Sequence, residues 1–536
     1  PPYTTWITAS DSIQKCINIC VDGDTVYVGV GTYIEKVTVS RSITFIGMSM
    51  DSCIIDGSNE LSEGVVRFTN NSVIENFTVI ARGQNLTTDC VQIFYTNVFM
   101  KNCKVLNGRI GIHLTESSSS IQNCLILYCS WGIGTMSTDS CKSFFNGNII
   151  ISKNSFDAAF YHPFGGSTNT KNNLILCEEN SSLGVSFESQ KRVVFENNLI
   201  SGFKRNNVQV RSHSDTVFVR NNNPMNVQNE SAFDINYYDK TVTSNNIIKN
   251  SNIGFNGGVK SDYNLFHNVN TPLNGGAYLG QKNVFADPMF VKDTIPTLNG
   301  EYDLHLQKYS PAIDAGDPNI LDIDGSRSDI GMFGGPLGQI YTYQDLAPKP
   351  PRNLTASMDS GLVHLKWNKN TEADLFRYRV YRDTVPDFIY DTTKIIAVLS
   401  DTTYYDDPPQ KFISGNYYYK ITAIDSAYHQ SPASEEAHIN ITGIPEAPPI
   451  VVEHYNLLQN YPNPFNPSTT IPYRLKAPGY VKVMVYNLLG EQVKVLVNKY
   501  QSAGYYEVLF HPTATERQSA EGKIEFETGY GDIVSG

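Results

Sequence analysis

The sequence is poor in charge, in long apolar runs and in paired cysteines. No apolar stretch approaches the roughly 18 residues that cross a bilayer, so no transmembrane segment is expected. Charged residues make up only 18%, the net charge is −12 and no basic block occurs, which argues against nucleic acid as a partner. The nine cysteines contain no CxxC pair, so a zinc site is not expected either.

Glycine (39), tyrosine (32) and phenylalanine (26) are plentiful, and asparagine is frequent between residues 70 and 270. Asn and Gly tolerate the positive φ angles of tight turns, and aromatic residues favour strands. The composition therefore predicts β-structure with many turns. A chain of 536 residues is too long for one ordinary domain and suggests about two to four.

One short motif is repeated. Asn-Asn-Leu-Ile stands at 172–175 and again, 25 residues later, at 197–200. Two further series of short apolar segments lie between such motifs, so each unit contains three strands of about four residues. The asparagines that precede an apolar run form a series along the chain: Asn76, Asn102, Asn123, Asn148, Asn173, Asn198, Asn223, Asn246 and Asn264.

Repeat units of this size cannot bury their apolar face alone, and stacking them makes a solenoid. The 3.6-residue periodicity of helical repeats is absent. We therefore predict an all-β chain that begins with a right-handed parallel β-helix over residues 1–345. The Asn series is expected to lie at turns between strands, in the left-handed conformation, with stacked side-chain amides bonded from turn to turn as a structural ladder.

Two details refine this prediction. Cys103 and Cys124 each follow an Asn of the series, which favours stacked interior thiols, with one or two disulfides as the alternative. Residues 10–20 predict a short amphipathic helix that closes the first turn of the rod against edge-to-edge growth. Its apolar face would carry Ile13, Cys16, Ile17 and Cys20.

The start "DSIQKCINICVDGDTVYVGVGTYIEKVTVSRSITFIG" and the end "SPAIDAGDP…DIDG…DIG" resemble the pectate-lyase-like β-helix superfamily over about residues 5–338. This resemblance implies the fold. For activity it implies a comparison with β-helix lyases, which abstract a proton beside a uronate carboxylate with a Lys or Arg base and neutralise that carboxylate with Ca²⁺ or an acidic cluster. The paired Asp, Gly-His-Gly and Arg-x-Lys motifs of the polygalacturonase branch are absent from the rod.

Two smaller modules follow the rod. Residues 346–443, with Trp367, Tyr381 and the run Tyr417–Tyr419, resemble a fibronectin type III β-sandwich. Residues 444–454 are a Pro-rich linker. Residues 455–536 contain "YPNPFNPSTT" and resemble the C-terminal sorting β-sandwich of type IX secretion. That resemblance implies the type IX machinery as a partner and a location outside the cell or at its outer surface.

Catalytic candidates come from side chains that strand alternation would send outward. One outward column would contain His113, Gly134, Phe160, Ser186, Gln209 and Asp234. A second would place His162, Glu188 and Arg211 on successive turns, with Asp234 close by. Arg211 or His162 could then act as a base. A cross-turn ion pair on a solvated face explains Glu188 and Arg211 equally simply, and we favour it.

The best metal candidates are Asp317, Asp322, Asp324 and Asp329 in "DPNILDIDGSRSDIG". Carboxylates in a Gly-containing loop suit Ca²⁺. Asp-Gly loops are also common as plain turns, and no other cofactor is indicated.

Three classes of function remain. We favour a structural or adhesive surface protein, a subunit of an extracellular filament. It would self-associate by strand addition between the tail Pro1–Ile7 and an open edge beside "GKIEFETGYG". The alternatives are a secreted polysaccharide lyase or hydrolase acting on uronate-containing glycans, and a non-catalytic polysaccharide-binding protein. The binding protein would use four outward aromatic residues: Phe160, Tyr161, Tyr237 and Tyr238. We lean against an enzyme; an enzyme would be lyase-like.

Overall fold

A computed structural model of the chain divides into two compact units, Pro1–Asp345 and Leu346–Gly536. The structure describes the whole chain except residues 1–2, 58–63, 82–87, 139, 153–157, 179–182, 189–190, 212–215, 228, 237–240, 360–361, 401–403, 408–413, 443–454, 462–467, 488, 512–523, 529–532 and 536. The linker 444–454 and the aromatic pair Tyr237 and Tyr238 therefore lie outside the described residues.

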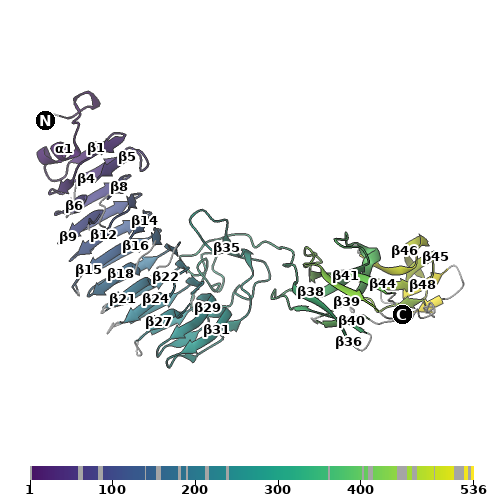
Figure 1. Ribbon diagram of the computed structural model, residues 1–536. Coiled ribbons are helices and arrows are strands. Elements are labelled where there is room, and N and C mark those ends of the chain that lie inside the picture. The colour runs from purple at the N-terminus through teal and green to yellow at the C-terminus, as the bar shows by residue number, and fades with distance from the viewer. Residues whose placement is uncertain are drawn as a thin grey trace. The chain divides into compact units, whose positions relative to one another are not determined.

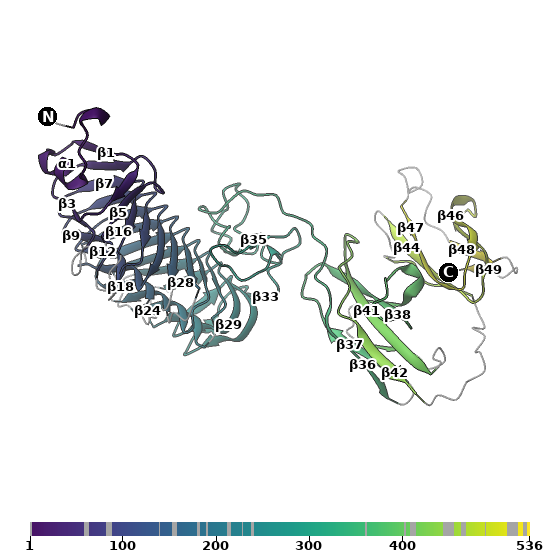
Figure 2. The same ribbon diagram turned by 45° about the horizontal axis from the view of Figure 1, so that its top comes forward.

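The first unit is a parallel β-helix, as the repeat predicts, and its strands stack turn upon turn (Figures 1 and 2). We call its three rows of strands faces A, B and C. Face A is a twelve-stranded parallel sheet of β1 (Thr25–Val28), β4 (Thr44–Gly47), β7 (Ser72–Glu75), β10 (Val98–Lys101), β13 (Ser120–Gln122), β16 (Lys142–Asn146), β19 (Ser167–Lys171), β22 (Arg192–Glu196), β25 (Thr216–Arg220), β28 (Thr241–Ser244), β30 (Lys260–Asp262) and β32 (Tyr278–Leu279).

The other two faces belong to one continuous sheet. Face B contains β2 (Gly31–Tyr33), β5 (Cys53–Asp56), β8 (Thr78–Ile80), β11 (Lys104–Leu106), β14 (Leu125–Cys129), β17 (Ile149–Ser152), β20 (Leu174–Cys177), β23 (Leu199–Ser201), β26 (Asn223–Met225) and β33 (Val284–Phe285). Face C contains β3 (Val37–Val39), β6 (Val66–Phe68), β9 (Val91–Phe94), β12 (Ile110–Thr115), β15 (Trp131–Met136), β18 (Ala158–Phe164), β21 (Leu183–Glu188), β24 (Asn206–Arg211) and β27 (Ser231–Ile235). The long strands β29 (Ile247–Asn256) and β31 (Leu265–Asn274) run through both faces.

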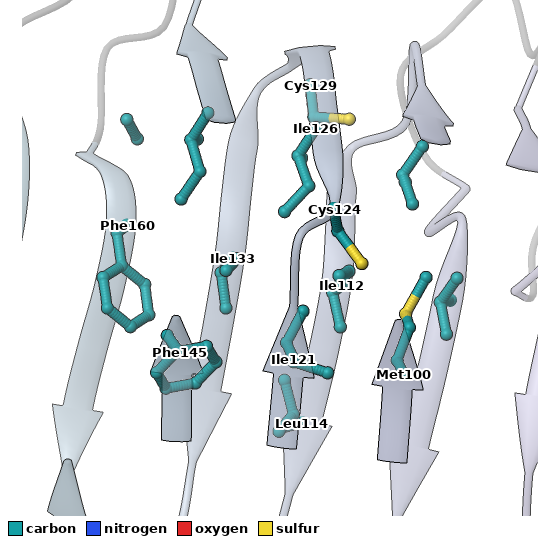
Figure 3. Packing of buried hydrophobic residues seen from close by; sticks show 14 of the residues in the cluster. Met100, Ile112, Leu114, Ile121, Cys124, Ile126, Cys129, Ile133, Phe145 and Phe160 are labelled. Atoms are coloured by element: carbon teal, nitrogen blue, oxygen red, sulfur yellow. The ribbon is translucent and has the colours of Figure 1, made fainter. Parts of the chain in front are cut away.

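The core of the rod is a continuous column of aliphatic, aromatic and cysteine side chains. Alternation along each strand sends every second side chain inward, and parallel register stacks like positions on adjacent turns. Figure 3 shows this for Ile112, Ile133 and Phe160, which occupy one inward column on β12, β15 and β18. All nine cysteines are free thiols, and burial raises the pKa of the Cys103 thiol, which lies beside Cys124.

The first turn is closed by α1 (Ile13–Ile19), which follows the short 3-10 helix η1 (Trp6–Thr8). Ile13 and Ile17 are buried in the rod core. Glu35, which follows β2, accepts hydrogen bonds from the backbone N–H of Ile13 at 2.8 Å and from the Ser12 hydroxyl at 2.8 Å. A carboxylate at this position satisfies free N–H groups at the start of the helix.

The two residues of each Asn pair at the corner between faces A and B have different structural roles. The first Asn of each pair takes a positive φ, for example 54° at Asn172 and 55° at Asn197. The second forms the ladder: each Oδ1 accepts from the backbone N–H and the Nδ2 of the Asn one turn earlier, at 2.9–3.0 Å. The bonded series runs through Asn148, Asn173, Asn198, Asn222, Asn246 and Asn264.

The predicted ladder therefore needs correction at four positions. Asn76, Asn102 and Asn123 belong to the left-handed column, with φ of 63°, 51° and 52°. The bonded column at those turns is occupied by Phe77, Cys103 and Cys124 instead, because Lys104 pairs with Thr78 and Leu125. Asn223 lies one residue beyond the ladder, and Asn222 takes its place. The predicted series therefore combined residues of two adjacent columns, the left-handed column and the hydrogen-bonded column.

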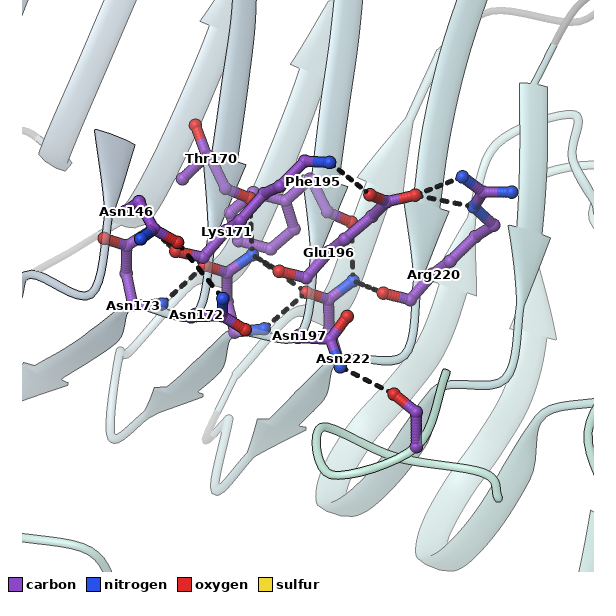
Figure 4. A network of polar contacts seen from close by, with 12 residues as sticks. Asn146, Thr170, Lys171, Asn172, Asn173, Phe195, Glu196, Asn197, Arg220 and Asn222 are labelled. Atoms are coloured by element: carbon purple, nitrogen blue, oxygen red, sulfur yellow. Dashed lines mark hydrogen bonds and ion pairs between the residues drawn. The ribbon is translucent and has the colours of Figure 1, made fainter. Parts of the chain in front are cut away.

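Face A carries charges beside this corner. Glu196 bridges Lys171 on one neighbouring turn, at 3.0 Å, and Arg220 on the other (Figure 4). Asn172 also donates to Asn146 at 3.1 Å across the turn. These contacts join side chains about 4.8 Å apart along the rod and reinforce the register that the buried ladder sets.

After β33 the chain returns over face B as a segment that we call the strap (residues 286–345). It contains β34 (Phe290–Lys292) and β35 (Asp303–Leu306), and it packs Leu304, Leu306 and Ile330 against apolar side chains of face B. Left-handed asparagines hold it in place: Asn197 Nδ2 donates to the Gly334 carbonyl at 2.7 Å. The strap explains why face B has outward apolar residues.

The second unit contains two β-sandwiches. The first pairs one sheet of β36 (Arg352–Asp359), β37 (Leu362–Asn368) and β40 (Tyr404–Asp407) with another of β39 (Ile395–Leu399), β38 (Leu375–Asp383), β41 (Gly415–Asp425) and β42 (Ala437–Ile441), and the 3-10 helix η2 (Thr392–Lys394) precedes β39. The second pairs β43 (Asn456–Leu457), β44 (Thr469–Leu475) and β47 (Gly504–Phe510) with β46 (Gln492–Gln501), β45 (Gly479–Tyr486), β48 (Ile524–Thr528) and β49 (Ile533–Ser535).

The two sandwiches contact each other. Glu507 of the second accepts from Arg379 of the first at 2.7 Å and from the Tyr461 hydroxyl at 2.6 Å. Arg377, which is 2% exposed, stacks 4.0 Å from the centre of the Tyr461 ring. Tyr461 opens the "YPNPFNPSTT" motif, so the described end of that motif is anchored on the first sandwich.

Both segments named in the strand-addition hypothesis have described intrachain structure. Trp6–Thr8 form a 3-10 helix with a capping box rather than an extended strand. β48 pairs with β45 on one side and with β49 on the other, so β49 and not β48 is the edge strand of this sheet. Of the described helices, none is long and apolar enough to cross a membrane.

Candidate functional site on face C

Strand register fixes which residues of face C share an outward column. Pairing through β6, β9, β12, β15, β18, β21, β24 and β27 gives one residue per turn. The column reads Arg67, Gln92, His113, Gly134, Tyr161, Ser186, Gln209 and Asp234. The predicted column from His113 to Asp234 is thus present, with Tyr161 in it rather than Phe160.

His162 and Phe160 point the other way. Phe160 pairs with Ile133 and Val185, and His162 pairs with Phe187. Because these partners are core residues, Phe160 and His162 also lie in the core, where they are 0% and 1% exposed. Burial lowers the pKa of His162 to about 3. His162 is therefore a neutral core residue and not an outward base, and Phe160 cannot stack on a glycan.

The remaining predicted catalytic residues do not gather into one site. Glu188 and Arg211 are register partners on β21 and β24, as expected for a cross-turn pair. Asp234 lies in the other outward column and accepts from Gln209 at 3.1 Å and from Asn256 at 2.9 Å. The Asp234 carboxylate therefore forms hydrogen bonds with amide groups of neighbouring turns in the wall of the rod.

A different polar centre lies nearer the N-terminal end of face C. Asp89, in the connection before β9, is 1% exposed. Its two oxygens accept from Arg109 Nε at 2.9 Å and Nη2 at 3.1 Å, from His113 Nδ1 at 2.8 Å and from Gln92 Nε2 at 3.1 Å. Burial raises the pKa of Asp89, but the hydrogen bonds from His113, Arg109 and Gln92 outweigh it and hold the pKa below its ordinary value.

Two nitrogen atoms of this centre are buried without a hydrogen-bond partner in the described part of the chain: His113 Nε2 and Arg67 Nε. The Phe94 ring lies close to both side chains. Its centre is 5.0 Å from that of the His113 ring and 5.6 Å from the Arg67 guanidinium carbon. Leaving a buried polar atom without a hydrogen bond costs about 1–3 kcal/mol. We therefore expect a bound molecule to form hydrogen bonds with these two nitrogen atoms.

Sequence reasoning had placed His113 in an outward column but had not identified this centre. Asp89, Arg109 and His113 come from three segments on neighbouring turns, and Asp89 stands in a connection rather than in a strand. The available signal was the step of one repeat between Asp89 and His113. Extending the columns back to Arg67 and Gln92 would have found the other members.

The four aspartates proposed for Ca²⁺ are all in the strap, but they serve separate turns. Asp329 accepts from the Asp314 N–H at 2.9 Å and from the Tyr343 hydroxyl at 2.8 Å. Asp317 and Asp324 each accept from a backbone N–H two residues on, at 2.9 Å, and Asp322 accepts from the backbone N–H of Asp329 at 3.1 Å. Within the described residues, no three of these four carboxylates bring oxygens within 4.8 Å of one another. The contacts given for these oxygens are with turn N–H groups and with hydroxyl groups, and Ca²⁺ binding by this loop stays a prediction.

No protein-family model matches this chain, and no curated protein matches it. Among solved structures, an Fn3-like protein from Clostridium thermocellum is 25% identical over 19% of this chain and 99% of its own, with a TM-score of 0.16. The pectin methylesterase PemA from Erwinia chrysanthemi is 8% identical over 52% of this chain and 78% of its own, with a TM-score of 0.22. A beta-1,2-glucanase from Parabacteroides distasonis is 21% identical over 22% of this chain, which spans 15% of that enzyme, with a TM-score of 0.16. Likenesses this weak do not bear on activity.

Proposed function

We propose that the β-helix unit acts on a carboxylate-bearing polysaccharide at the centre formed by Asp89, Arg109 and His113. One observation carries the proposal: an Asp-oriented histidine presents an unpartnered, buried ring nitrogen on the same face as an arginine that also has an unpartnered nitrogen. A base and a cation on one face are the two groups that proton abstraction next to a carboxylate requires.

The tautomer of His113 follows from its partner. The lowered pKa keeps Asp89 ionised at neutral pH, so its oxygens only accept hydrogen bonds. The Nδ1 of His113, 2.8 Å away, must therefore carry the proton and donate it. In neutral His113 the lone pair then lies on Nε2, and Asp89 would stabilise the imidazolium formed when Nε2 takes a proton.

Arg67 supplies the charge that selects the substrate. Arg109 is already paired through two nitrogens with Asp89, whereas Arg67 contacts the Phe94 ring and its Nε has no partner in the described part of the chain. Arg67 and His113 lie two turns apart in one column, about 9.6 Å along the rod. A guanidinium suits a sugar carboxylate better than a neutral hydroxyl.

The reaction that fits is β-elimination. His113 Nε2 takes the proton from the carbon next to the carboxylate, and Arg67 stabilises the negative charge that develops on the carboxylate oxygens. The released electron pair forms a carbon–carbon double bond as the bond to the glycosidic oxygen breaks. The leaving oxygen receives the proton back from His113, so the centre returns to its starting state.

The test is turnover on a panel of soluble uronate polymers, followed by the ultraviolet absorbance of the new double bond conjugated with the carboxylate. His113→Gln should lower turnover by about 10²–10⁴-fold with an unchanged melting temperature. His267→Gln is the matched control, because His267 also lies beside a buried carboxylate, 3.8 Å from Asp287 on another face. Its turnover should be unaffected.

A purely structural network predicts the opposite pattern. In that case the wild-type protein would show no turnover on any uronate polymer, and His113→Gln would lower only stability, with ordered water at the two unpaired nitrogens. Either wild-type inactivity across the panel or full activity of His113→Gln rejects the proposed centre.

A location outside the cell remains a proposal supported by the resemblance of residues 455–536 to the type IX sorting domain. It is tested by fusing those residues to a reporter enzyme in a type IX-competent host and assaying the culture medium. Self-association into a filament stays a second proposal. A joint by strand addition would use the edge strand β49, because β48 is paired on both sides, and the tail would have to leave its 3-10 helix at Trp6–Thr8.

A further inference from the structure

Face A carries a groove of about 430 Å³ near the N-terminal end of the rod. It crosses β4, β7, β10 and β13, so it runs from turn to turn along the rod. Its lining includes Thr44, Asn71, Asn97, Phe99, Ser118 and Ser120, and every side chain that lines it is uncharged. The groove lies on a different sheet from the centre of face C, and neither the repeat nor the catalytic columns had pointed to it.

The groove contains a row of oriented amides. Asn71 Oδ1 accepts from the backbone N–H of Asn97 at 2.8 Å, and Asn97 Oδ1 accepts from that of Ser118 at 2.7 Å. Ser118 Oγ in turn accepts from the backbone N–H of Lys142 at 2.9 Å. Each side chain is thus fixed by the next turn of the rod, about 4.8 Å away.

Fixing the oxygen of an amide also fixes its nitrogen. The Nδ2 groups of Asn71 and Asn97 have no partner among the residues that the structure describes, and both side chains are exposed. They present N–H donors at the repeat of the rod, with little conformational entropy left to lose on binding. A linear ligand with acceptors along its length would meet one such donor per turn.

An outward column beside these amides supplies an apolar surface. Register through β4, β7, β10, β13 and β16 aligns Thr44, Val73, Phe99, Ser120 and Phe144. Phe99 lies in the groove, and Phe144, two turns further on, is 45% exposed. Sugar rings have C–H-rich faces and hydroxyl edges, so an aromatic ring flanked by hydrogen-bond donors matches both parts.

We infer that this groove binds a neutral polysaccharide chain lying along the rod axis. Uncharged walls offer nothing to neutralise a uronate carboxylate, so the ligand differs from the substrate proposed for face C. An extended peptide fits less well, because the strands here already pair on both sides within face A and leave no edge for strand addition. The inference is independent of the reaction centre, since it needs no residue of face C.

The test measures binding of the full chain to soluble β-glucan, xylan and galactomannan by affinity electrophoresis, with polygalacturonate as the acidic comparison. Phe99→Ala should weaken binding of the preferred neutral polymer at least tenfold, a change of about 1.4 kcal/mol. Phe218→Ala is the matched control: Phe218 shares the outward column of face A but lies beyond the groove, under two arginines. It should bind like the wild type.

A second variant guards against a folding effect of Phe99→Ala. Ser120→Glu adds charge and bulk to the groove without removing a core residue, and it should abolish neutral-glycan binding while the melting temperature stays within the range of the wild type. Wild-type affinity in Phe99→Ala or in Ser120→Glu overturns the inference. So does wild-type binding restricted to polygalacturonate, or the absence of binding to every neutral polymer. These readouts are separate from uronate turnover, so either proposal can fail alone.

Discussion

Asn172 and Asn173 are adjacent in sequence, but their amides lie in different surroundings. Asn172 takes a left-handed φ of 54° and lies at the surface of the corner. Asn173 is 1% exposed, and its Nδ2 donates to the carbonyls of Lys171 and Phe145 while its Oδ1 accepts from Asn148. At the corner the N–H groups of Asn172 and Leu174 pair with backbone carbonyls of adjacent turns, and the buried amide of Asn173 accepts from the backbone N–H of Asn148 on the preceding turn.

Replacing Asn173 by Leu should lower the free energy of unfolding by about 2–5 kcal/mol, because several buried backbone groups lose their partners. Asn169→Leu is the control in the preceding strand β19, since Asn169 belongs to the outward column of face A. It should change stability by less than about 1 kcal/mol. The measurement is denaturant unfolding of residues 1–345. Equal effects from the two variants would remove the ladder from the account of stability.

Burial of His162 gives the rod a pH dependence. Its pKa falls from 6.5 to about 3 on folding, because burial disfavours the charged ring. The folded state then binds fewer protons than the unfolded state below pH 6.5, so the contribution to stability is full above 6.5 and is lost as pH falls towards 3. The slope should approach about 1.4 kcal/mol per pH unit within that window.

His162→Phe should remove this slope, since Phe160 and Phe187 already surround the position with aromatic rings. The check is the melting temperature of variant and wild type between pH 4 and 8, scored as the difference between them. His438→Phe, an exposed position in the second unit, should leave the slope unchanged. A wild-type slope that survives in His162→Phe would mean that other groups set it.

At the scale of elements, strand alternation predicted the outward column from His113 to Asp234, but it failed at β18. There Phe160 pairs with the inward residues Ile133 and Val185, one residue away from the predicted alignment, and such a displacement exchanges the inward and outward sets. No pattern in the sequence around His162 indicates this displacement. The centre at Asp89 was missed for another reason, because the side chains of Asp89, Arg109 and His113 meet only when neighbouring turns stack.

The strap is the second element that the sequence indicated only in part. Its motif predicted an end to the rod, and the structure adds that its apolar residues cover face B. Leu306→Ala should lower the free energy of unfolding by about 2–5 kcal/mol, since Leu306 is 3% exposed in that contact and a cavity would remain.

Leu321→Ala makes the same chemical change in the strap at a position that is 51% exposed, so it should cost little. Limited proteolysis tells whether the strap loosens first: cleavage of Leu306→Ala should begin between residues 286 and 345 while the rod stays intact. Simultaneous loss of rod and strap would show that they unfold as one cooperative unit.

For the whole molecule, the division into Pro1–Asp345 and Leu346–Gly536 makes a prediction about folding. Each hydrophobic cluster draws its residues from one unit alone. The last contacts of the strap, the Gln307–Gln344 bridge and the Lys308–Asp345 ion pair at 3.2 Å, stay inside the first unit. A cut between 345 and 346 therefore exposes no core.

We expect residues 1–345 and 346–536, produced separately, to be folded and to melt at the temperatures of the two transitions of the full chain. The control is residues 1–285, which lack the strap and leave Leu199, Met225 and Ile247 of face B uncovered. That fragment should melt lower or aggregate, because this apolar surface loses its cover. If calorimetry of the full chain gives one transition that neither separate unit reproduces, each unit depends on the other for its stability, and the boundary at 345 is not a folding boundary.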